Sequence, residues 1–414
     1  HYQILNHCYG LEMEMGHKEV GGVKAKMGHS GHYDHIMEQL EIDWKYSDAL
    51  QAADNEKQVK YIVRDIFRLH GLDVTFMAKP MEGVAGSGEH THLGLAAKLK
   101  DGRVVSMFSS KDGKDFLNVI GYGALMGILN NYEVINPFIS ATNDAFNRLK
   151  PGFEAPVCTV TSMGHSVEAP SRNRTVLAGL IREAGNPLAT RFELRSPNPN
   201  SNTYLVIAAS YMAMLDGIRA AVTAGKTPAE LEKSISKKKG EEDFYLETGR
   251  EYRSEKDVFA HYTPEERDDI FGRPPETVWE NITAFDKYPE KLEIFKSGGV
   301  MTDIVLESYR EAIVNQWATE LYNRIIPNAM DTVRSCRKLH NESATDYDIG
   351  MWAKISAQRD KIAKNTMNKF CILKKISDAL DKADYNLASR LQLEAQREIR
   401  KLIDMYSSYK RNLL

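Results

Sequence analysis

The segment TFMAKPMEGVAGSGEHTHL, from Thr75 to Leu93, decides how the first half of this chain is interpreted. Its apolar beginning predicts a β-strand that ends at the turn Lys79-Pro80. A glycine-rich loop follows, and the chain leaves this loop on a second predicted strand that carries His90 and His92. Because successive strand residues point to opposite faces, the two histidine side chains are expected on one face.

The chemistry of this segment is compatible with a ligand site. A loop of small residues (Gly83, Gly86 and Gly88) lets a charged ligand approach the backbone, and histidine is a common metal ligand. Glycine-rich loops without a ligand are also common, and two strand histidines can equally be structural or lie at the surface. The segment alone therefore leaves both interpretations open.

A second segment, TRFELRSPN at residues 190–198, narrows the choice. Arg191, Glu193 and Arg195 are spaced by two residues, so a strand would project all three from one face. Such a row is either an exposed, salt-bridged strand or a metal-binding carboxylate flanked by two guanidinium groups that hold phosphate or carboxylate. The second interpretation is favoured by two further arginine-bearing motifs, NRLKPGFEAP (147–156) and SRNRTV (171–176).

Taken together and in this order, the blocks of the chain resemble glutamine synthetase. The resemblance is dense between residues 10 and 220 and continues weakly to residue 330. The matching blocks are GLEMEMGHKEV (10–20), EIDWKYSDALQAADN (41–55), TFMAKPMEGVAGSGEHTHLGL (75–95), NRLKPGFEAP (147–156), RNR (172–174), RFELRSPNP (191–199) and SNTYLVIAASYMAMLDGI (201–218).

The resemblance implies an α+β fold, in which a curved antiparallel β-sheet is flanked by α-helices. Residues 1–330 would form the catalytic domain, without the small N-terminal β-domain and the first metal-binding strand that precede it in the family. Residues 331–414 exceed the usual end of the family and are expected to form a helical C-terminal extension.

The activity implied by the resemblance is that of an ATP-dependent glutamate–ammonia ligase. ATP would phosphorylate the γ-carboxylate of glutamate with Mg²⁺ or Mn²⁺ as cofactor, and ammonia would displace phosphate from the resulting γ-glutamyl phosphate. Family members build stacked rings, so a homo-oligomer with active sites shared between neighbouring subunits is expected. Two alternatives stay open: a γ-glutamyl ligase that uses another amine, such as a polyamine or ethanolamine, and a non-catalytic structural relative.

The resemblance assigns metal ligands position by position. Glu19 and Glu41 match ligands of the metal ion nearer glutamate. Asp43 is the alternative to Glu41, because an insertion at residues 20–40 widens the interval between the two glutamates. Carboxylates of this kind suit the hard divalent cations that phosphoryl transfer requires. The residues that match the surroundings of the ion touching the ATP phosphates are Glu14, His90 and Glu193.

Substrate contacts follow in the same way. Arg148 and Arg195 match the arginines that hold the carboxylates of glutamate, and the Gly86 backbone matches the contact to its amino-acid group. The family usually has Asn just before this glycine, whereas this chain has Ala85. Glu154 matches a flap residue that closes the site and helps to take a proton from ammonium.

The residues that match nucleotide contacts in the family are Glu14, His92, Arg174, Arg182 and Arg191. Among them, Arg174 matches an arginine that contacts phosphate. Arg182 is the least regular match, because its spacing from Arg174 differs by a few residues from that in the family. The set of catalytic residues implied by the resemblance is Glu154, Arg148, Arg174 and Arg195.

Composition bounds the remaining possibilities. The 54 basic and 57 acidic residues leave a net charge of −3, which gives no electrostatic argument for nucleic acid or an anionic membrane as a partner. The four cysteines are scattered without a CxxC pair and predict free thiols in a reducing, cytoplasmic location. No run of about 18 consecutive apolar residues predicts a membrane span.

Two polar regions are expected to be solvated loops. The first is the insertion at residues 20–40, where His29, His32 and His35 lie close together at a spacing that fits no usual metal motif. The second includes the charged run SKKKGEED (236–243). Helices are predicted for residues 55–70, 119–133, 203–222 and from 296 to the end.

Overall fold

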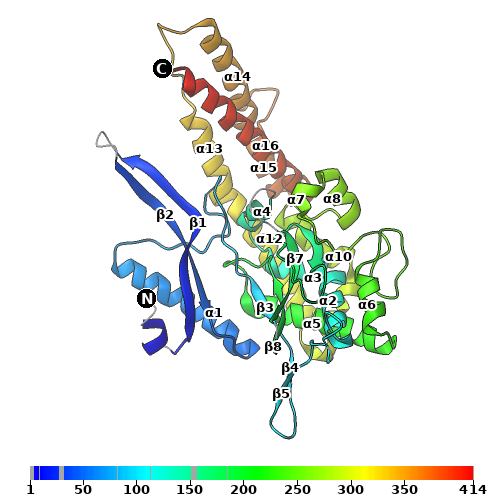
Figure 1. Cartoon of the computed structure of the whole chain (residues 1–414). Helices are drawn as coiled ribbons and strands as arrows, with labels where there is room; N and C mark the ends of the chain where they lie inside the picture. Colours follow the sequence, from blue (N-terminus) through cyan, green and yellow to red (C-terminus); the bar gives the residue numbers. More distant parts are fainter. Residues whose placement is uncertain are drawn as a thin grey trace. The chain divides into compact units, whose positions relative to one another are not determined.

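The structure is a computed structural model that describes residues 4–8, 10–27, 32–81, 83–111, 113–150, 156–183 and 185–413. The chain divides into two compact units. The first unit comprises His1–Pro274 and Ala284–Val305, and the second comprises Pro275–Thr283 and Leu306–Leu414. Several sheets and helices make up the first unit, whereas the described part of the second is helical, so the predicted α+β class is confirmed (Figure 1).

A long antiparallel hairpin of β1 (Met13–Met27) and β2 (His32–Trp44) begins the first unit. The register changes around Glu14, so Met13 and Trp44 pair on one face, while His17 and Glu41 pair on the other. The first of these faces is apolar and packs on helix α1 (Ala49–Leu69) through α1 residues such as Val59 and Ile62. The other face is therefore left to carry polar side chains.

The insertion at residues 20–40 lengthens both strands of this hairpin instead of forming the expected loop. The pairing continues through Lys24 with His35 and ends at Met27 with His32. His29 lies outside the described residues, and so do the side chains of His32 and His35. The sequence interpretation of these histidines therefore stays a prediction.

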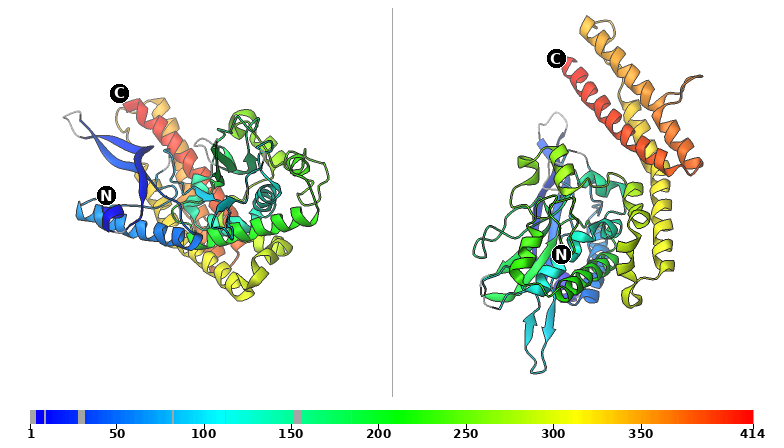
Figure 2. Two further views of the ribbon diagram at one scale, coloured as in Figure 1. Left: turned by 60° about the horizontal axis from the view of Figure 1, so that its bottom comes forward. Right: turned by 90° about the vertical axis from the view of Figure 1, so that its right-hand side faces the viewer.

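The central sheet has the order β3-β8-β7-β6, formed by β3 (Thr91–Leu93), β8 (Asn186–Leu194), β7 (Val176–Glu183) and β6 (Cys158–Ser162). The pairings of β3 with β8 and of β8 with β7 are antiparallel, as expected, but β6 pairs with β7 in parallel. Along β8, Phe192 and Leu194 are fully buried, and the alternate residues Arg191 and Glu193 point to the opposite face. A separate hairpin of β4 (Ala96–Lys98) and β5 (Val104–Ser106) extends from this region (Figures 1 and 2).

Helices α2 (Val119–Asn130) and α5 (Thr203–Thr223) cross at very short range. A Cβ atom added to Gly127 would lie 2.0 Å from the carbonyl oxygen of Ala213, and one added to Gly217 would lie 2.1 Å from that of Gly123. These glycines are thus required by the close approach of two backbones. The short helices α3 (Tyr132–Ile139) and α4 (Asn143–Arg148) follow α2, and α4 leads into the site described below.

Helix α5 is long and apolar enough, by length and composition, to cross a membrane. Half of its most apolar window is buried, and it packs along α2, α3 and α1 within the first unit. A core helix meets the same test, so this single helix is weak evidence for a membrane span.

The remaining helices of the first unit follow the central sheet in the chain. They are α6 (Pro228–Ile235), α7 (Val258–His261), α8 (Pro264–Phe271), α10 (Ala284–Lys287) and α11 (Pro289–Leu292). Most of the charged run at 236–243 is exposed, as predicted, but Lys237 is buried and donates a hydrogen bond of 3.0 Å to the carbonyl oxygen of Arg250. The Arg250 guanidinium pairs with Glu133 of α3, so this loop is anchored to the helical layer.

The second unit is a helical assembly. Its elements are α9 (Val278–Ile282), most of α12 (Asp303–Glu320), α13 (Ile326–Ser335), α14 (Asp346–Ala363), α15 (Ile372–Asp381) and α16 (Tyr385–Lys410). Helices α14 and α16 run side by side (Figure 2). The compact unit begins at Leu306, within α12, and the family boundary expected at residue 330 stays a prediction.

We expect Gly127→Ala to destabilise the first unit by about 1–3 kcal/mol, because the new methyl group would force α2 and α5 apart. Gly350→Ala is the matched control, since Gly350 lies in α14 with open space around it and should gain up to about 1 kcal/mol of helix stability. Urea denaturation followed by circular dichroism measures both. Equal stabilities of Gly127→Ala and the wild type would contradict the packing described for α2 and α5.

Candidate active site

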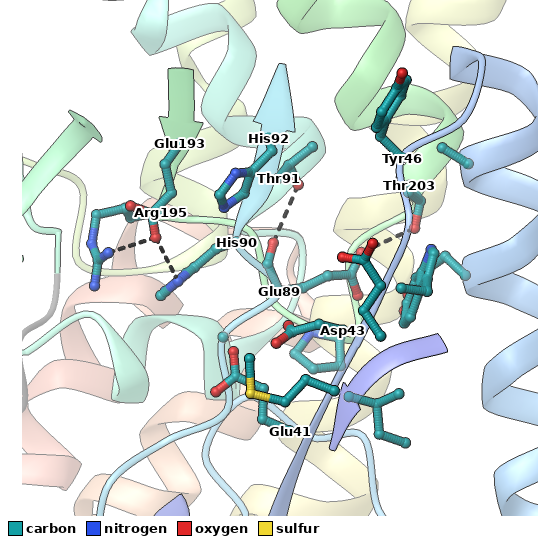
Figure 3. A pocket seen from close by; sticks show the side chains of 18 of the residues that line it. Glu41, Asp43, Tyr46, Glu89, His90, Thr91, His92, Glu193, Arg195 and Thr203 are labelled. Carbon is teal, nitrogen blue, oxygen red and sulfur yellow. Dashed lines mark hydrogen bonds and ion pairs between the residues drawn. The ribbon is translucent and has the colours of Figure 1, made fainter. Parts of the chain in front are cut away.

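A large cavity of the first unit gathers most of the residues that the sequence singled out. Its walls are the polar face of the β1–β2 hairpin, the glycine-rich loop with β3, and the exposed face of β7 and β8. Figure 3 shows His90, His92 and Glu193 on one side of this cavity and Glu41 and Asp43 on another. Segments distant in sequence thus meet within one unit.

The glycine-rich loop lies directly on Arg148, the last residue of α4. A Cβ atom on Gly88 would lie 2.6 Å from Arg148 Nη2, and one on Gly86 would lie 2.5 Å from the carbonyl oxygen of Ala78. The small residues were predicted to let a charged ligand approach the backbone. In the structure, the absence of side chains at these glycines makes room for the Arg148 guanidinium group of the protein itself.

Arg148 is half-buried as a residue, and its guanidinium group is withdrawn from solvent. It donates hydrogen bonds to the carbonyl oxygens of Ser196 (3.0 Å) and Arg195 (3.1 Å). Burial, together with the neighbouring Arg195 guanidinium, lowers the pKa of Arg148 to about 10. No carboxylate of the described residues forms an ion pair with it. A buried charge without a counter-charge is costly, so this position favours binding of an anion.

His90, Glu193 and Arg195 form a connected group (Figure 3). Glu193 Oε1 lies 3.0 Å from His90 Nδ1 and accepts a hydrogen bond of 2.7 Å from Arg195 Nη1. Burial alone would raise the pKa of Glu193, but the hydrogen bond with His90 and the Arg195 charge hold it at about 2. The carboxylate is therefore ionised at neutral pH, as a metal ligand must be.

His92 lies opposite Glu193 in the pairing of β3 with β8. Its Nδ1 accepts a hydrogen bond of 2.8 Å from Arg191 Nε, so the proton of a neutral ring is on Nε2. Burial lowers the pKa values of both His90 and His92. His92 of β3 therefore lies on the same face of the sheet as Arg191 and Glu193 of β8, as the alternation predicted. His90, just before β3, and Arg195, just beyond β8, reach the same place through their contacts with Glu193.

A second group lies on the β1–β2 hairpin. His17 Nε2 is 2.8 Å from Glu19 Oε1 and 3.4 Å from Glu41 Oε2, and one ligand atom from each residue falls within 4.8 Å of the others. Burial and the hydrogen bond with Glu19 raise the pKa of Glu41. Asp43, the alternative to Glu41, is on the same strand face opposite Met15 but outside this group.

Sequence reasoning missed His17. The signal was present, because His17 and Glu19 are two residues apart on a predicted strand and must share a face. Their partner Glu41 could not be recognised in the same way, since the register between strands separated by the insertion is a tertiary property.

Gln39 is a second residue that the sequence did not reveal. Its Oε1 accepts a hydrogen bond of 2.7 Å from the Gly21 backbone, and its Nε2 donates to the Gly86 carbonyl oxygen at 3.0 Å. Because Gln39 pairs with Glu19 in the hairpin register, it fixes the carboxylate-bearing strands against the glycine-rich loop.

Glu89 is a third. Its carboxylate lies 2.8 Å from Lys60 Nζ and accepts a hydrogen bond of 3.1 Å from Thr203 Oγ1, and Lys60 also pairs with Glu56 at 2.6 Å. Helices α1 and α5 are thereby joined to the segment that carries the two histidines (Figure 3). Burial beside Glu56 raises the pKa of Glu89 to about 8.

Not every predicted residue joins these groups. Glu14 and Arg174 line the cavity, and the Arg174 carbonyl oxygen accepts a hydrogen bond of 3.1 Å from Arg195 Nε. Within the described ranges, no hydrogen bond or ion pair joins Glu14 to His90 or Glu193. Arg182 is not among the residues that line the cavity, and its Nη1 donates to the Val167 carbonyl oxygen at 3.2 Å. Glu154 lies outside the described residues.

Comparison with known proteins finds one family. A model of the glutamine synthetase catalytic domain matches residues 22–248. The glutamine synthetase of Clostridium saccharobutylicum is 38% identical over 210 residues, which are 50% of this chain and 42% of that protein. The glutamine synthetase of Frankia alni is 36% identical over 210 residues, which are 51% of this chain and 39% of that protein. The glutamine synthetase of Thermococcus kodakarensis is 35% identical over 239 residues, which are 58% of this chain and 42% of that protein. The chain spans about two fifths of the length of these relatives.

The raised pKa of Glu89 makes a prediction for stability. The folded protein binds a proton at this site more tightly than the unfolded chain, so its stability should fall as pH rises from 4.5 towards 8. Glu89→Gln does not titrate but can still contact Lys60 and Thr203. Relative to the wild type, this variant should gain on the order of 2 kcal/mol between pH 5 and pH 8.5.

Urea denaturation at several pH values measures this difference. The exposed Glu290→Gln is the matched control and should follow the wild type throughout. If the stabilities of the wild type and Glu89→Gln stayed parallel across this range, the assignment of a tightly held proton to Glu89 would be wrong.

Proposed function

The chain belongs to the glutamine synthetase family, and from this premise we propose that it catalyses the ATP-dependent ligation of ammonia to glutamate through γ-glutamyl phosphate. The observation that carries the proposal is the buried Arg148 guanidinium, which lies beside Arg195 without a carboxylate partner of its own in the described part of the chain. An amino-acid carboxylate supplies the anion that this position favours. Both candidate groups of metal ligands open onto the same cavity.

Glutamate is held at both ends in this proposal. Arg148 and Arg195 hold its carboxylates, and their planar guanidinium groups suit two-point contacts that an ammonium group cannot make. The Gly86 backbone contacts the amino-acid group. Ala85 lacks the amide side chain usual at this position, so the backbone and neighbouring groups carry that contact.

The donor groups fit divalent cations. Glu19 and Glu41 offer hard carboxylate oxygens. Glu193 offers an ionised carboxylate. The neighbouring His90 has a lowered pKa, so its neutral ring offers a lone pair. We assign Glu19 and Glu41 to one Mg²⁺ or Mn²⁺ ion and Glu193, His90 and Glu14 to another. When bound, such ions neutralise charge on a phosphoryl group during its transfer.

The nucleotide side is assigned to Arg174, Arg191, His92 and Glu14, which all line the cavity. Arginine groups directed at the transferring phosphoryl group stabilise the charge that it carries in the transition state. Arg182 receives no such role, because it does not line the cavity and donates a hydrogen bond to the Val167 carbonyl oxygen.

Two further roles are proposed from the family alone, and the cellular location is proposed from the cysteines. Glu154 takes a proton from ammonium and closes the site as part of a flap. The chain assembles into a homo-oligomer of stacked rings whose neighbouring subunits share active sites. The four free cysteines are consistent with a cytoplasmic location.

We expect Glu193→Gln to lower glutamate-dependent phosphate release from ATP by at least about 100-fold, because the change removes a charged ligand and the partner of the Arg195 guanidinium and the His90 ring. The exposed Glu290→Gln is the control and should keep wild-type turnover. The assay follows phosphate and glutamine in the full-length protein with ammonium. Wild-type turnover of Glu193→Gln would refute its placement at the reacting centre.

Arg148→Lys should raise the KM for glutamate roughly 10- to 100-fold with a smaller effect on the KM for ATP, because a lysine cannot reproduce the two-point contact. Arg219→Lys on α5 is the matched control. Equal changes in both KM values would place Arg148 in folding rather than in glutamate binding. A wild-type preference for putrescine or ethanolamine over ammonium would leave a γ-glutamyl ligase but not a glutamine synthetase.

A further inference from the structure

We propose that His17 is a protein ligand, together with Glu19 and Glu41, of the divalent ion held by the β1–β2 hairpin, and that this nitrogen ligand makes the site select Mn²⁺ over Mg²⁺. The inference rests on the proposed function, which assigns only the two carboxylates to this ion. It adds a residue and a metal preference that the family assignment does not contain.

The positions of the three groups are set by the backbone of the hairpin. His17 pairs directly with Glu41 across the two strands, and Glu19 follows His17 by two residues on the same strand face. All three residues lie within the paired strands, so a change of backbone conformation is not needed to bring the donors together. The link from Gln39 to the Gly86 carbonyl oxygen holds this part of the hairpin against the cavity.

The distances suit a shared ion. His17 Nε2 lies 2.8 Å from Glu19 Oε1 and 3.4 Å from Glu41 Oε2. Ligand atoms bound at about 2.1–2.2 Å to one ion are separated by about 3–3.5 Å, so small side-chain rotations bring all three to an ion. Among the described residues, Glu19 and Glu41 are the only groups that contact His17 Nε2. Without an ion, Nε2–H donates to these carboxylates; binding of the ion takes the place of this proton, because a ligand nitrogen must be deprotonated.

The imidazole nitrogen decides the metal preference. Mg²⁺ prefers oxygen ligands in near-ideal octahedral geometry and keeps several waters, so it gains little from a histidine. First-row transition ions bind imidazole readily, and Mn²⁺ is the member of this series closest to Mg²⁺ in its use of carboxylates. A site with one nitrogen and two carboxylate donors therefore favours Mn²⁺ over Mg²⁺.

The first test is a calorimetric titration of the full chain with Mn²⁺ and with Mg²⁺ at one fixed pH. A His90→Asn background removes the other histidine assigned to an ion. In this background, His17→Asn should weaken Mn²⁺ binding roughly 10-fold or more and Mg²⁺ binding less than about 3-fold. His261→Asn, an exposed histidine of α7, is the control and should change neither affinity.

The second test detects the proposed nitrogen ligand of the bound Mn²⁺ ion directly. Pulsed electron paramagnetic resonance of bound Mn²⁺ detects coupling to a coordinated imidazole nitrogen. The His90→Asn protein should show this coupling, and the double variant His90→Asn/His17→Asn should lose it. Persistence of the nitrogen signal and of the Mn²⁺ preference in the double variant would overturn the role of His17.

Glu19→Gln separates this inference from the proposed function. If Glu19→Gln removes Mn²⁺ binding while His17→Asn does not, the ion site stands and His17 is not its ligand. If neither change affects Mn²⁺ binding, the site itself is wrong. Glutamate-dependent phosphate release by the wild-type protein with Mn²⁺ tests the proposed function independently, because it does not depend on which side chains hold the ion.

Discussion

The close contact between the glycine-rich loop and the buried Arg148 guanidinium is the constraint on which the site depends. Gly86 and Gly88 allow the loop to approach where any side chain would collide with Ala78 or Arg148. Arg148 in turn donates to the carbonyl oxygens of Ser196 and Arg195, just beyond β8. This one contact therefore fixes the loop, the end of α4 and the charged end of β8 against one another.

Two linkages extend this arrangement to the rest of the first unit. Gln39 connects the loop to the hairpin that carries Glu19 and Glu41. Glu89 connects the strand with the two histidines to α1 and α5 through Lys60 and Thr203. The buried charges of this region are costly in isolation, and most are offset by a partner of opposite charge. Among the cations that line the cavity, Arg148 has no ion pair with a described carboxylate, which is why an anionic substrate is the natural complement of the site.

Local periodicity was enough to predict part of this geometry. The spacing of Arg191, Glu193 and Arg195 predicted that their side chains project to one side. The spacing of His90 and His92 predicted the same for the two rings. Both predictions need only the alternation of neighbouring residues in a strand. The structure pairs His92 with Glu193 and thereby joins the two rows. The helices predicted at 55–70 and 203–222 are also present as α1 and α5, with α1 starting earlier.

Properties set by tertiary contacts could not be predicted. The role of Gly86 and Gly88 in admitting Arg148, the pairing of Glu89 with Lys60, and the extension of the hairpin through the insertion depend on residues distant in sequence. Arg182 was already the least regular match in spacing, and it does not line the cavity although its neighbours Ile181 and Glu183 do, because a family match fixes order along the chain rather than the direction of a side chain.

The central claim is that glutamate, held beside Arg148, is phosphorylated by ATP before any amine reacts. Positional isotope exchange tests it directly, using ATP labelled with ¹⁸O in the bridge between its β- and γ-phosphates, with glutamate present and ammonium absent. Reversible formation of γ-glutamyl phosphate frees the β-phosphate of ADP to rotate, so the account predicts that label moves from the bridge to non-bridging positions only when glutamate is added. Absence of glutamate-dependent scrambling, in a protein that releases phosphate when ammonium is present, would contradict a γ-glutamyl phosphate intermediate.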